Sequence, residues 1–510
     1  MTDLLSPPEV HAPRVLDLAR FGDRVAVHTP SGTLTYAELA GRVDAFAARL
    51  GDTRRLVLVE GANTVESLTA YLGALTHGHV VLLAPPGRPA DLLAAAWDPD
   101  VVAGDELRIR RDGTAHDLHP DLALLLSTSG STGSPKLVRL SHDNLRSNAA
   151  SIADYLELTT DDRAITSLPL HYCYGLSVVH SHLLVGAGLV LTDLSVVDEC
   201  FWRLAADAGA TSFAGVPYTF DLLERSGHAC RDLPHLRYVT QAGGRLGPDA
   251  VRAWRARGRA AGWDLVVMYG QTEATARMAW LPPELADARP EAVGVPVPGG
   301  AFRLAAVPEV DEPGVGELVY EGPNVMLGYA EQRTDLARGA DLDELRTGDL
   351  ARCVDGVWEI VGRRGRHAKL FGLRLDLDHL ERQPSGATDA RLVVVDDVLH
   401  AFTARPRVAD HLRDALVLAS GLPASAIRVT TLAELPRTES GKHDLVALAA
   451  HARMLRSEPA PACLRDELAL VLGRSDATTA DSFVSLGGDS LSYVELATRL
   501  ADRLGDLPAD

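Results

Sequence analysis

LLLSTSGSTGSPK, residues 124–136, joins an apolar run to a loop of Ser, Thr and Gly that closes on a lysine. Gly130 and Gly133 permit backbone conformations and close approaches that a side chain would block, so successive N–H groups and hydroxyls can face one anion. Such a loop suits a polyphosphate. It departs from the Walker pattern because Lys136 follows Pro135 instead of Gly. A plain surface turn is the alternative. The residues expected to contact phosphate are Thr128, Ser129, Gly130, Ser131, Thr132, Gly133 and Lys136.

Short runs rich in Val, Leu and Ile alternate with alanine-rich helical patterns on both sides of this loop. Residues 34–50 carry apolar side chains at helical spacing and predict a helix. The long apolar stretch Gly175 to Leu191 contains His180 and His182, which favours a buried helix and strand over a membrane span. Alternating strands and helices predict a layered α/β core. The expected strands are Leu56–Glu60, Val80–Ala84, Leu122–Leu126, Leu189–Leu191, Tyr238–Gln241 and Leu265–Tyr269, then Gly316–Glu321 and Gly356–Val361.

Composition and charge narrow the class of protein. The chain has 510 residues and a net charge of −19, which repels nucleic-acid phosphates and anionic membrane surfaces. Five cysteines stand at least 27 residues apart without a CxxC pair, so neither a disulfide framework nor a zinc site is indicated. The opening MTDLLSPPEV lacks the basic start and apolar core of a signal peptide. We therefore expect a cytoplasmic protein with no nucleic-acid or membrane partner.

Lysine is scarce in this chain. It occurs only at Lys136, Lys369 and Lys442, whereas arginine occurs 47 times. A chain that uses Arg for nearly every cation has kept Lys where a compact ammonium on a flexible stem can be required by chemistry. Random survival of three lysines explains the count equally well by itself.

Several composition changes predict domain boundaries. After Pro313 the pattern changes from alternating helices and strands to short strands with turns. We expect a large core over residues 1–363, a hinge at 364–366 and a small α+β subdomain over 366–455. Prolines then interrupt the chain, and residues 460–510 are acidic with a helical pattern, which predicts a third, helical domain.

Seven motifs in fixed order resemble the adenylate-forming superfamily, which includes acyl-CoA synthetases, adenylation domains of nonribosomal peptide synthetases and firefly-type luciferases. The resemblance runs from about Leu34 to Asp444. Besides the loop, the motifs are GG at 243–244, YGQTE at 269–273, GELVYEGPNVMLGY at 316–329, RTGDL at 346–350, GRRGRHAKLFGLRLDLDHLE at 362–381 and LPRTESGKHD at 435–444.

The resemblance implies a role for each motif residue. It places Tyr269 against the adenine, Thr272 on the α-phosphate and Glu273 on Mg²⁺, where a carboxylate helps to neutralise the pyrophosphate that leaves. Further expected nucleotide contacts are Gly243, Gly244, Asp349 on the ribose hydroxyls, Arg363 on the ribose and Arg374 on phosphate. Each of these also has a structural explanation, such as aromatic packing for Tyr269, a turn for Asp349 or solvated arginines.

Lys442 is the strongest catalytic candidate. When a carboxylate attacks the α-phosphate, negative charge builds up between two anions, and one mobile cation stabilises that transition state more than the ground state. All three lysines fall inside family motifs. The chain departs from the family pattern at Gly365, where an Asp or Lys usually marks the hinge between the two domains. Glycine keeps rotation possible there but removes a polar latch.

The segment DSFVSLGGDSLSYVELATRL, residues 481–500, resembles the phosphopantetheine-bearing part of acyl and peptidyl carrier proteins. Ser490 begins a helical pattern, where the positive helix end favours an anionic phosphodiester. Simple helix capping by Asp489 and Ser490 is the alternative. Only 20 residues follow Ser490, fewer than the remaining helices of a complete carrier need, so a partial carrier is expected.

These features predict an acid–thiol ligase of the nonribosomal peptide synthetase type. It would use ATP and Mg²⁺ to make an acyl-AMP, release pyrophosphate, and load the phosphopantetheine on Ser490. Its partners would be a small carboxylic acid, a phosphopantetheinyl transferase and a downstream acyl-accepting enzyme. An acyl-CoA ligase with a vestigial tail and a non-catalytic nucleotide-binding protein are the alternatives. A luciferase-like oxidation has no sequence feature in its favour.

The acid pocket is expected at Tyr172, Gly175, Val216, Pro217 and Gly270. The segment SLPLHYCYGLSVVHSH, residues 167–182, resembles the corresponding stretch of acyl-CoA synthetases and holds no carboxylate to pair with a substrate ammonium. Burying an ammonium there without a counter-charge would be costly, so an uncharged acyl tail is favoured. A carboxylate from elsewhere, such as Asp221, is the alternative.

Overall fold

The computed structural model describes residues 16–455 and Thr478, except 128–135, 227–232, 309, 311, 365, 371–372, 383–389, 397, 421, 423 and 439–440. The phosphate-loop candidates Thr128 to Gly133, the hinge candidate Gly365 and the attachment candidate Ser490 lie outside the described residues. The same holds for the side chains of Lys369 and Arg374.

Contacts divide the described chain into two units. The larger comprises 16–347, 351–360 and 441–442, and the smaller comprises 348–350, 361–438 and the residues from 443 on. The domain limits expected from the sequence stay a prediction.

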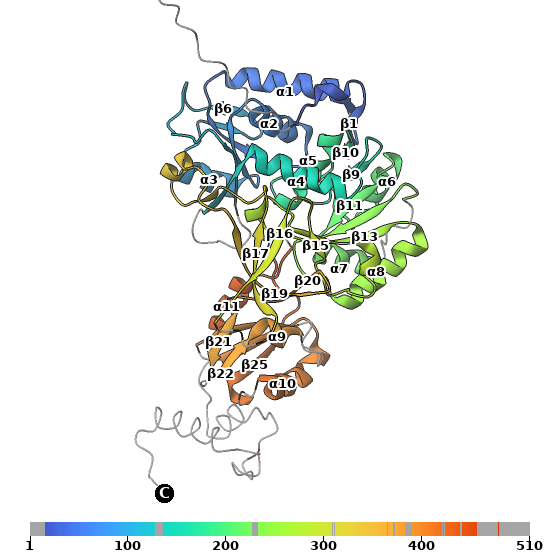
Figure 1. The fold of residues 1–510 in the computed structure, drawn as a ribbon, viewed down its shortest axis with the longest axis vertical. Helices are drawn as coiled ribbons and strands as arrows, with labels where there is room; N and C mark the ends of the chain where they lie inside the picture. The colour runs from blue at the N-terminus through green and yellow to red at the C-terminus, as the bar shows by residue number, and fades with distance from the viewer. Residues whose placement is uncertain are drawn as a thin grey trace, which may run out of the picture. The chain divides into compact units, whose positions relative to one another are not determined.

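Two large sheets of mixed parallel and antiparallel strands form the centre of the larger unit (Figure 1). The first has nine strands in the order β15-β14-β13-β12-β11-β9-β10-β1-β2, and the second has seven in the order β18-β8-β7-β4-β3-β5-β6. The strands of the first are β1 (Val25–Thr29), β2 (Gly32–Thr35), β9 (Arg163–Ile165), β10 (Gly188–Val190), β11 (Ser212–Gly215), β12 (Tyr238–Gln241), β13 (Asp264–Tyr269), β14 (Ala279–Leu281) and β15 (Val295–Pro296). Those of the second are β3 (Leu56–Glu60), β4 (Val80–Ala84), β5 (Val101–Ala103), β6 (Leu107–Ile109), β7 (Leu122–Ser127), β8 (Leu137–Ser141) and β18 (Gly328–Ala330).

Helices join and cover these strands, so the predicted layered α/β fold is confirmed (Figure 1). They are α1 (Tyr36–Leu50), α2 (Val65–Thr76), α3 (Arg88–Trp97), α4 (His142–Tyr155), α5 (Cys173–Val185), α6 (Glu199–Asp207), α7 (Pro217–Ser226) and α8 (Pro248–Ala261), with the short helices η1 (Ala19–Phe21), η3 (Pro283–Leu285) and η4 (Arg333–Ala337). The stretch expected as a buried helix and strand forms α5 and β10. None of the described helices combines the length and apolar character that a bilayer span requires.

One predicted helix begins later than expected. The sequence pattern placed its start at Leu34, but residues up to Thr35 belong to β2 and α1 begins at Tyr36. The cause is a capping box: the Thr35 hydroxyl accepts from the Glu38 N–H at 3.1 Å, and the Glu38 carboxylate accepts from the Thr35 N–H at 2.8 Å.

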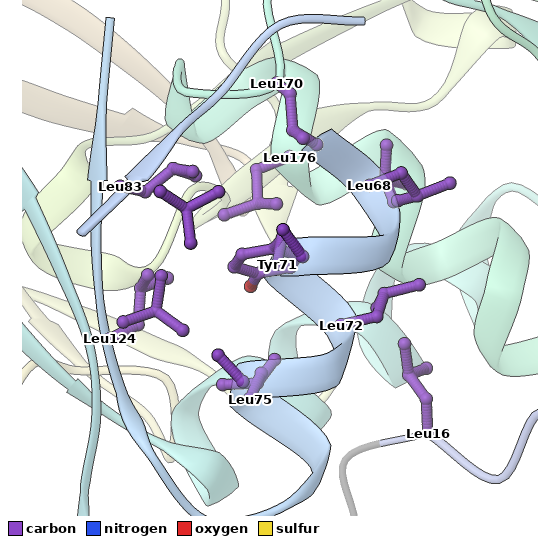
Figure 2. Close-up of a cluster of buried hydrophobic side chains, with 14 of the residues drawn as sticks. Leu16, Leu68, Tyr71, Leu72, Leu75, Leu83, Leu124, Leu170 and Leu176 are labelled. Atoms are coloured by element: carbon purple, nitrogen blue, oxygen red, sulfur yellow. The ribbon is translucent and has the colours of Figure 1, made fainter. Parts of the chain in front are cut away.

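The main apolar core contains side chains from both large sheets and from α1, α2 and α5. Tyr71 of α2 is fully buried among leucines (Figure 2). Its hydroxyl hydrogen-bonds His180 Nε2 of α5 at 2.8 Å, so the one polar atom of this side chain has a partner inside the core. Burial lowers the pKa of His180 to about 4, which keeps the imidazole neutral near pH 7.

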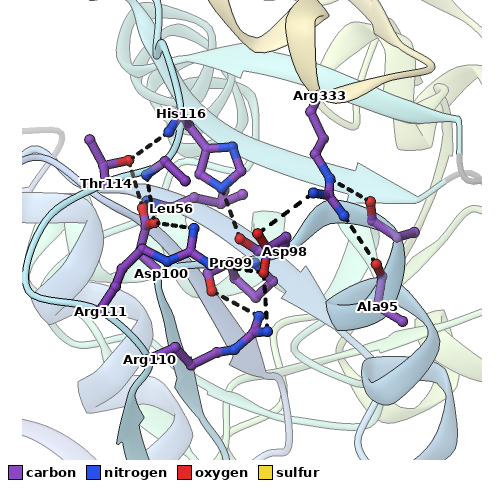
Figure 3. A network of polar contacts seen from close by, with 12 residues as sticks. Leu56, Ala95, Asp98, Pro99, Asp100, Arg110, Arg111, Thr114, His116 and Arg333 are labelled. Atoms are coloured by element: carbon purple, nitrogen blue, oxygen red, sulfur yellow. Dashed lines mark hydrogen bonds and ion pairs between the residues drawn. The ribbon is translucent and has the colours of Figure 1, made fainter.

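A buried carboxylate holds the edge of the seven-stranded sheet (Figure 3). Asp100 has no exposed surface and accepts from the Leu56 N–H at 2.9 Å, the Thr114 hydroxyl at 2.7 Å and Arg111 Nη1 at 3.2 Å. Its neighbour Asp98 pairs with Arg111 at 2.9 Å. Because both oxygens of Asp100 accept hydrogen bonds and Arg111 supplies a positive charge, the negative charge of Asp100 is tolerated inside the protein.

The remaining strands form smaller sheets. A four-stranded sheet has the order β16-β17-β19-β20, from β16 (Ala301–Ala305), β17 (Val315–Glu321), β19 (Leu345–Val354) and β20 (Val357–Arg363). The smaller unit contains β21 (His367–Leu370) paired with β22 (Leu373–Asp376), and a sheet of β23 (Ala390–Val395), β24 (Val398–Thr403) and β25 (Ile427–Thr431). Its helices are α9 (Leu377–Arg382), α10 (Pro406–Ser420), η6 (Ala424–Ala426) and α11 (Leu445–Met454).

Candidate active site

A tight turn after β13 carries several of the predicted site residues. β13 ends at Tyr269, and β14 returns antiparallel with Ala279 opposite Tyr269. Between them lies the short helix η2 (Thr272–Ala274). Gly270 allows the turn to close, because a Cβ at this position would lie 1.8 Å from the Ala276 carbonyl oxygen. Any other residue there would push the two arms of the turn apart.

Two asparagines fix the far arm of this turn. Asn324 donates from Nδ2 to the carbonyl oxygens of Ala274 and Arg277, both at 2.8 Å. Asn148 of α4 donates to the same Arg277 oxygen at 3.1 Å. The Thr275 hydroxyl closes the set by donating to the Asn324 carbonyl at 2.7 Å. The turn is therefore held in place before any ligand arrives.

The turn brings Glu273 near Lys136 through a tyrosine. Tyr329 of β18 donates its hydroxyl to Glu273 Oε1 at 2.7 Å. The Lys136 ammonium lies 3.5 Å from the centre of the Tyr329 ring and 3.7 Å from Glu331 Oε1. Strand pairing produces this arrangement, because β18 runs antiparallel to β8, which starts directly after Lys136. Lys136, which is expected to bind phosphate, and Glu273, which is expected to bind Mg²⁺, therefore both contact Tyr329.

Thr272 faces the start of α5. Its hydroxyl donates to Cys173 Sγ at 3.3 Å. Burial raises the pKa of the Cys173 thiol, although the charges of Arg277 and Lys442 act to lower it. The thiol is therefore neutral near pH 7 and serves as an acceptor for the Thr272 hydroxyl.

Predicted pocket residues lie next to the predicted nucleotide contacts Gly243 and Gly244 at the carboxyl ends of β11 and β12. Gly243 has a φ of 81°, and a Cβ there would lie 2.6 Å from the Tyr172 hydroxyl and 3.0 Å from Val216 Cγ1. A Cβ at Gly244 would lie 3.2 Å from Pro217 Cγ. Gly243 therefore leaves room for Tyr172 against the backbone, and Gly244 leaves room for Pro217. Ligands of open α/β sheets bind at this edge, outside the carboxyl ends of the strands.

Gly175 permits a second close approach in this region. A Cβ at Gly175 would lie 2.3 Å from the Pro169 carbonyl oxygen, so the first turn of α5 packs directly on the preceding loop. Burial raises the pKa of Tyr172, the N-cap residue of α5, so its hydroxyl is a neutral donor or acceptor at the pocket.

The other predicted residues divide between the two units. Asp349 and Arg363 belong to the smaller unit, where Arg363 Nε pairs with Asp349 Oδ1 at 3.3 Å. Gly441 and Lys442 group with the larger unit. A Cβ at Gly441 would lie 2.9 Å from Val216 Cγ2. Lys442 itself is exposed.

Sequence reasoning missed three residues that touch these groups. Tyr329 and Cys173 lie inside motifs that were noted, but no pattern marks a tyrosine as the partner of Glu273 or a cysteine as the partner of Thr272. Arg277 follows YGQTE closely and is buried. In a chain with 47 arginines, nothing in the sequence distinguishes it from the exposed ones.

The donor set fits a nucleotide-bound Mg²⁺ better than a resident metal. No group of three or more His, Cys, Asp and Glu side chains that could hold an ion occurs among the described residues. Mg²⁺ commonly binds through one or two carboxylates together with substrate phosphates, and Glu273 alone can supply such a carboxylate.

Comparison with known proteins identifies the two parts of the chain. Residues 96–330 match the family model described as "AMP-binding enzyme", and residues 463–510 match "Phosphopantetheine attachment site". The chain thus contains an AMP-binding enzyme region followed by a phosphopantetheine attachment site.

The chain is similar to much longer proteins. It is 30% identical to phenyloxazoline synthase MbtB of Mycobacterium tuberculosis over 92% of the chain, and 31% identical to the isonitrile lipopeptide synthase of Streptomyces coeruleorubidus over 95% of it. It spans 37% and 38% of the length of these two relatives. The fold is that of ATP-bound MatB from Rhodopseudomonas palustris, at 23% identity and a TM-score of 0.68, covering 87% of this chain and 99% of that one.

We predict that Tyr329→Phe slows ATP–pyrophosphate exchange about tenfold, because Glu273 loses a hydrogen bond that orients its carboxylate. The rate should recover in part at higher Mg²⁺ concentration, since the metal can then reorient the carboxylate. Tyr36→Phe is the matched control, because the Tyr36 hydroxyl donates to the Ala187 carbonyl in the core at 2.6 Å. Equal rates for wild type and Tyr329→Phe at every Mg²⁺ concentration would remove the positioning role from Tyr329.

Proposed function

We propose that the chain activates a carboxylic acid with ATP and loads it onto its own carrier domain. In the first step a carboxylate oxygen bonds to the α-phosphorus, and pyrophosphate leaves. In the second step the phosphopantetheine sulfur on Ser490 attacks the acyl carbon, and AMP leaves. The observation that supports this most is the β13 turn, which holds Thr272 and Glu273 beside α5 in a chain that also carries an attachment site.

Each site residue has a role in the proposal. Lys442 stabilises the charge that builds up as the carboxylate attacks, and Thr272 contacts the α-phosphate. Glu273 helps to hold Mg²⁺, which neutralises the leaving pyrophosphate when it is bound. Contacts to the rest of the nucleotide are assigned to Thr128, Ser129, Gly130, Ser131, Thr132, Gly133, Lys136, Gly243, Gly244, Tyr269, Asp349, Arg363 and Arg374, with rotation at Gly365. Around the acid we place Tyr172, Gly175, Val216, Pro217 and Gly270.

The attachment segment favours the carrier over free coenzyme A as the acyl acceptor. Residues 463–510 follow the adenylation domain in the same chain, so the thiol is supplied at a high effective concentration. The proposal requires a phosphopantetheinyl transferase to modify Ser490 and a downstream enzyme to take the acyl group. ATP–pyrophosphate exchange with a broad set of acids tests the first step without any acceptor.

We predict that Lys442→Ala lowers the rate of adenylate formation about 10²- to 10³-fold and leaves transfer from supplied acyl-AMP largely intact. The reason is that the charge between carboxylate and α-phosphate exists only in the first step. Arg453→Ala removes an exposed cation from α11 and is the control. Equal losses in both steps, or a loss under tenfold in the first, would remove Lys442 from this role.

We predict that Ser490→Ala leaves ATP–pyrophosphate exchange unchanged and abolishes acyl loading after treatment with a phosphopantetheinyl transferase and coenzyme A. Intact-mass measurement reads out both modifications. Ser492→Ala, which removes a hydroxyl two residues further on, should load normally. A mass gain on Ser490→Ala would contradict the assignment, and efficient acylation of free coenzyme A would favour the ligase alternative.

A further inference from the structure

The larger unit contains a small cavity beside α5, the helix whose first residue contacts Thr272. It has a volume of about 20 Å³ and lies among α4, α5 and the strands β11, β12 and β13. Its lining includes Ser177 and His182 of α5, Tyr238 of β12, and Arg277 from the turn after η2. A space of this size exceeds the about 10–15 Å³ that a single water needs, so it admits a small polar group.

Arg277 is a buried cation without an ion-pair partner among the residues that the structure describes. Its exposed fraction is 3%, and its guanidinium carbon lies 3.9 Å from the centre of the Tyr174 ring. Nη1 donates to the Ala276 carbonyl at 2.9 Å, whereas Nε and Nη2 have no hydrogen-bond partner. Among the described residues, no carboxylate forms an ion pair with it. Burial raises the pKa values of Tyr155 and Tyr174, and the nearby guanidinium acts against that shift, but neither hydroxyl meets hydrogen-bond geometry with it.

Two more polar atoms that line the cavity also lack partners. His182 Nδ1 hydrogen-bonds the Val178 carbonyl at 2.9 Å, which requires that Nδ1 carry the proton and leaves Nε2 as an unused acceptor. The Tyr238 hydroxyl has no hydrogen-bond partner either, although Ser212 lies near enough to lower its pKa against the effect of burial. Burial lowers the pKa of His182 to about 4, so Arg277 is the cation among these groups near pH 7.

Leaving these groups unsatisfied is expensive. A buried charge is normally paired, and a buried donor without a partner costs about 1–3 kcal/mol. The cost is tolerated where a ligand supplies the missing partner: a carboxylate can accept from Arg277 and from the Tyr238 hydroxyl, whereas His182 Nε2 needs a donor such as water. An anionic group matches Arg277 best, because its oxygens can accept from both Nε and Nη2. A substrate ammonium would be repelled.

The cavity is also placed to receive the far end of an acid. Cys173, at the start of α5, touches Thr272 of the reaction centre, and Ser177 is one helical turn further on. At 1.5 Å per residue, the cavity wall at Ser177 begins about 6 Å along the helix from Cys173. A short acid with its reacting carboxylate near Thr272 can therefore place a second group beside Arg277.

We propose that the acid activated by this chain is a short dicarboxylic acid, whose second carboxylate is bound by Arg277 and is not adenylated. The inference rests on the proposed function and gives it a substrate class. It departs from the uncharged tail that the sequence favoured, because that expectation weighed only residues 167–182 and not Arg277. It agrees with the same expectation that no substrate ammonium is bound here.

Matched pairs of acids in the ATP–pyrophosphate exchange assay test the proposal. Succinate, glutarate and adipate are compared with butanoate, pentanoate and hexanoate, which differ only in the far carboxylate. We expect the best dicarboxylate to exchange about 10- to 100-fold faster than its partner, as one charge-assisted pair implies. Arg277→Met should abolish that preference by slowing the dicarboxylates alone, and Arg277→Lys should retain part of it.

Arg255→Met is the matched control. Arg255 is also buried, with an exposed fraction of 6% and an unpartnered Nε, but it pairs with Asp264 at 2.8 Å and does not line the cavity. It should keep the dicarboxylate preference. Nucleotide binding and melting temperature show whether each variant folds.

The outcomes separate the inference from the proposed function. Faster exchange with the monocarboxylates, or an unchanged preference in folded Arg277→Met, would mean that an ordered water fills the cavity, and would overturn the inference alone. Exchange with other acids but with none of these six would do the same. Failure of every acid to support exchange would contradict the proposed function as well.

Discussion

The close passage of the backbone at Gly270 under the Ala276 carbonyl sets the geometry of the whole site. It lets one short turn carry Thr272 and Glu273 on one side and Arg277 on the other, while Asn324 and Asn148 hold the far arm. The residues that we propose for chemistry at the α-phosphate and for recognition of the acid are therefore held a few residues apart on one turn. A side chain at Gly270 would disturb both together.

The fold was largely predictable because local patterns and burial agree. Strands such as Leu56–Glu60 and Val80–Ala84 are short apolar runs that are buried in the centre of a sheet, and the structure has them at the expected residues. The start of α1 was wrong by two residues, because the Thr35–Glu38 capping box outweighs the apolar spacing that included Leu34. The spacing of apolar residues predicts that a helix forms, but it does not include the capping hydrogen bonds that decide where the helix begins.

The site was predictable only where a motif carried it. Tyr172, Val216 and Gly243, which are far apart in the sequence, do come together at one sheet edge. Tyr329 reaches Glu273 because β18 pairs with β8, and Arg277 is buried because the turn folds back on itself. The Tyr329–Glu273 contact and the burial of Arg277 both result from tertiary structure. A local sequence pattern contains no information about either. The roles of Lys442 and Ser490 stay predictions.

The nucleotide product tests most directly whether the acid attacks the α-phosphate of ATP before it is loaded. Holo protein carrying phosphopantetheine is incubated with ATP and an activated acid, and nucleotides are quantified beside the acyl-loaded chain. Attack on the α-phosphate predicts one AMP and one pyrophosphate for each acyl group loaded. Formation of ADP and inorganic phosphate in step with loading would show that the acid attacks the γ-phosphate instead, and would contradict the account.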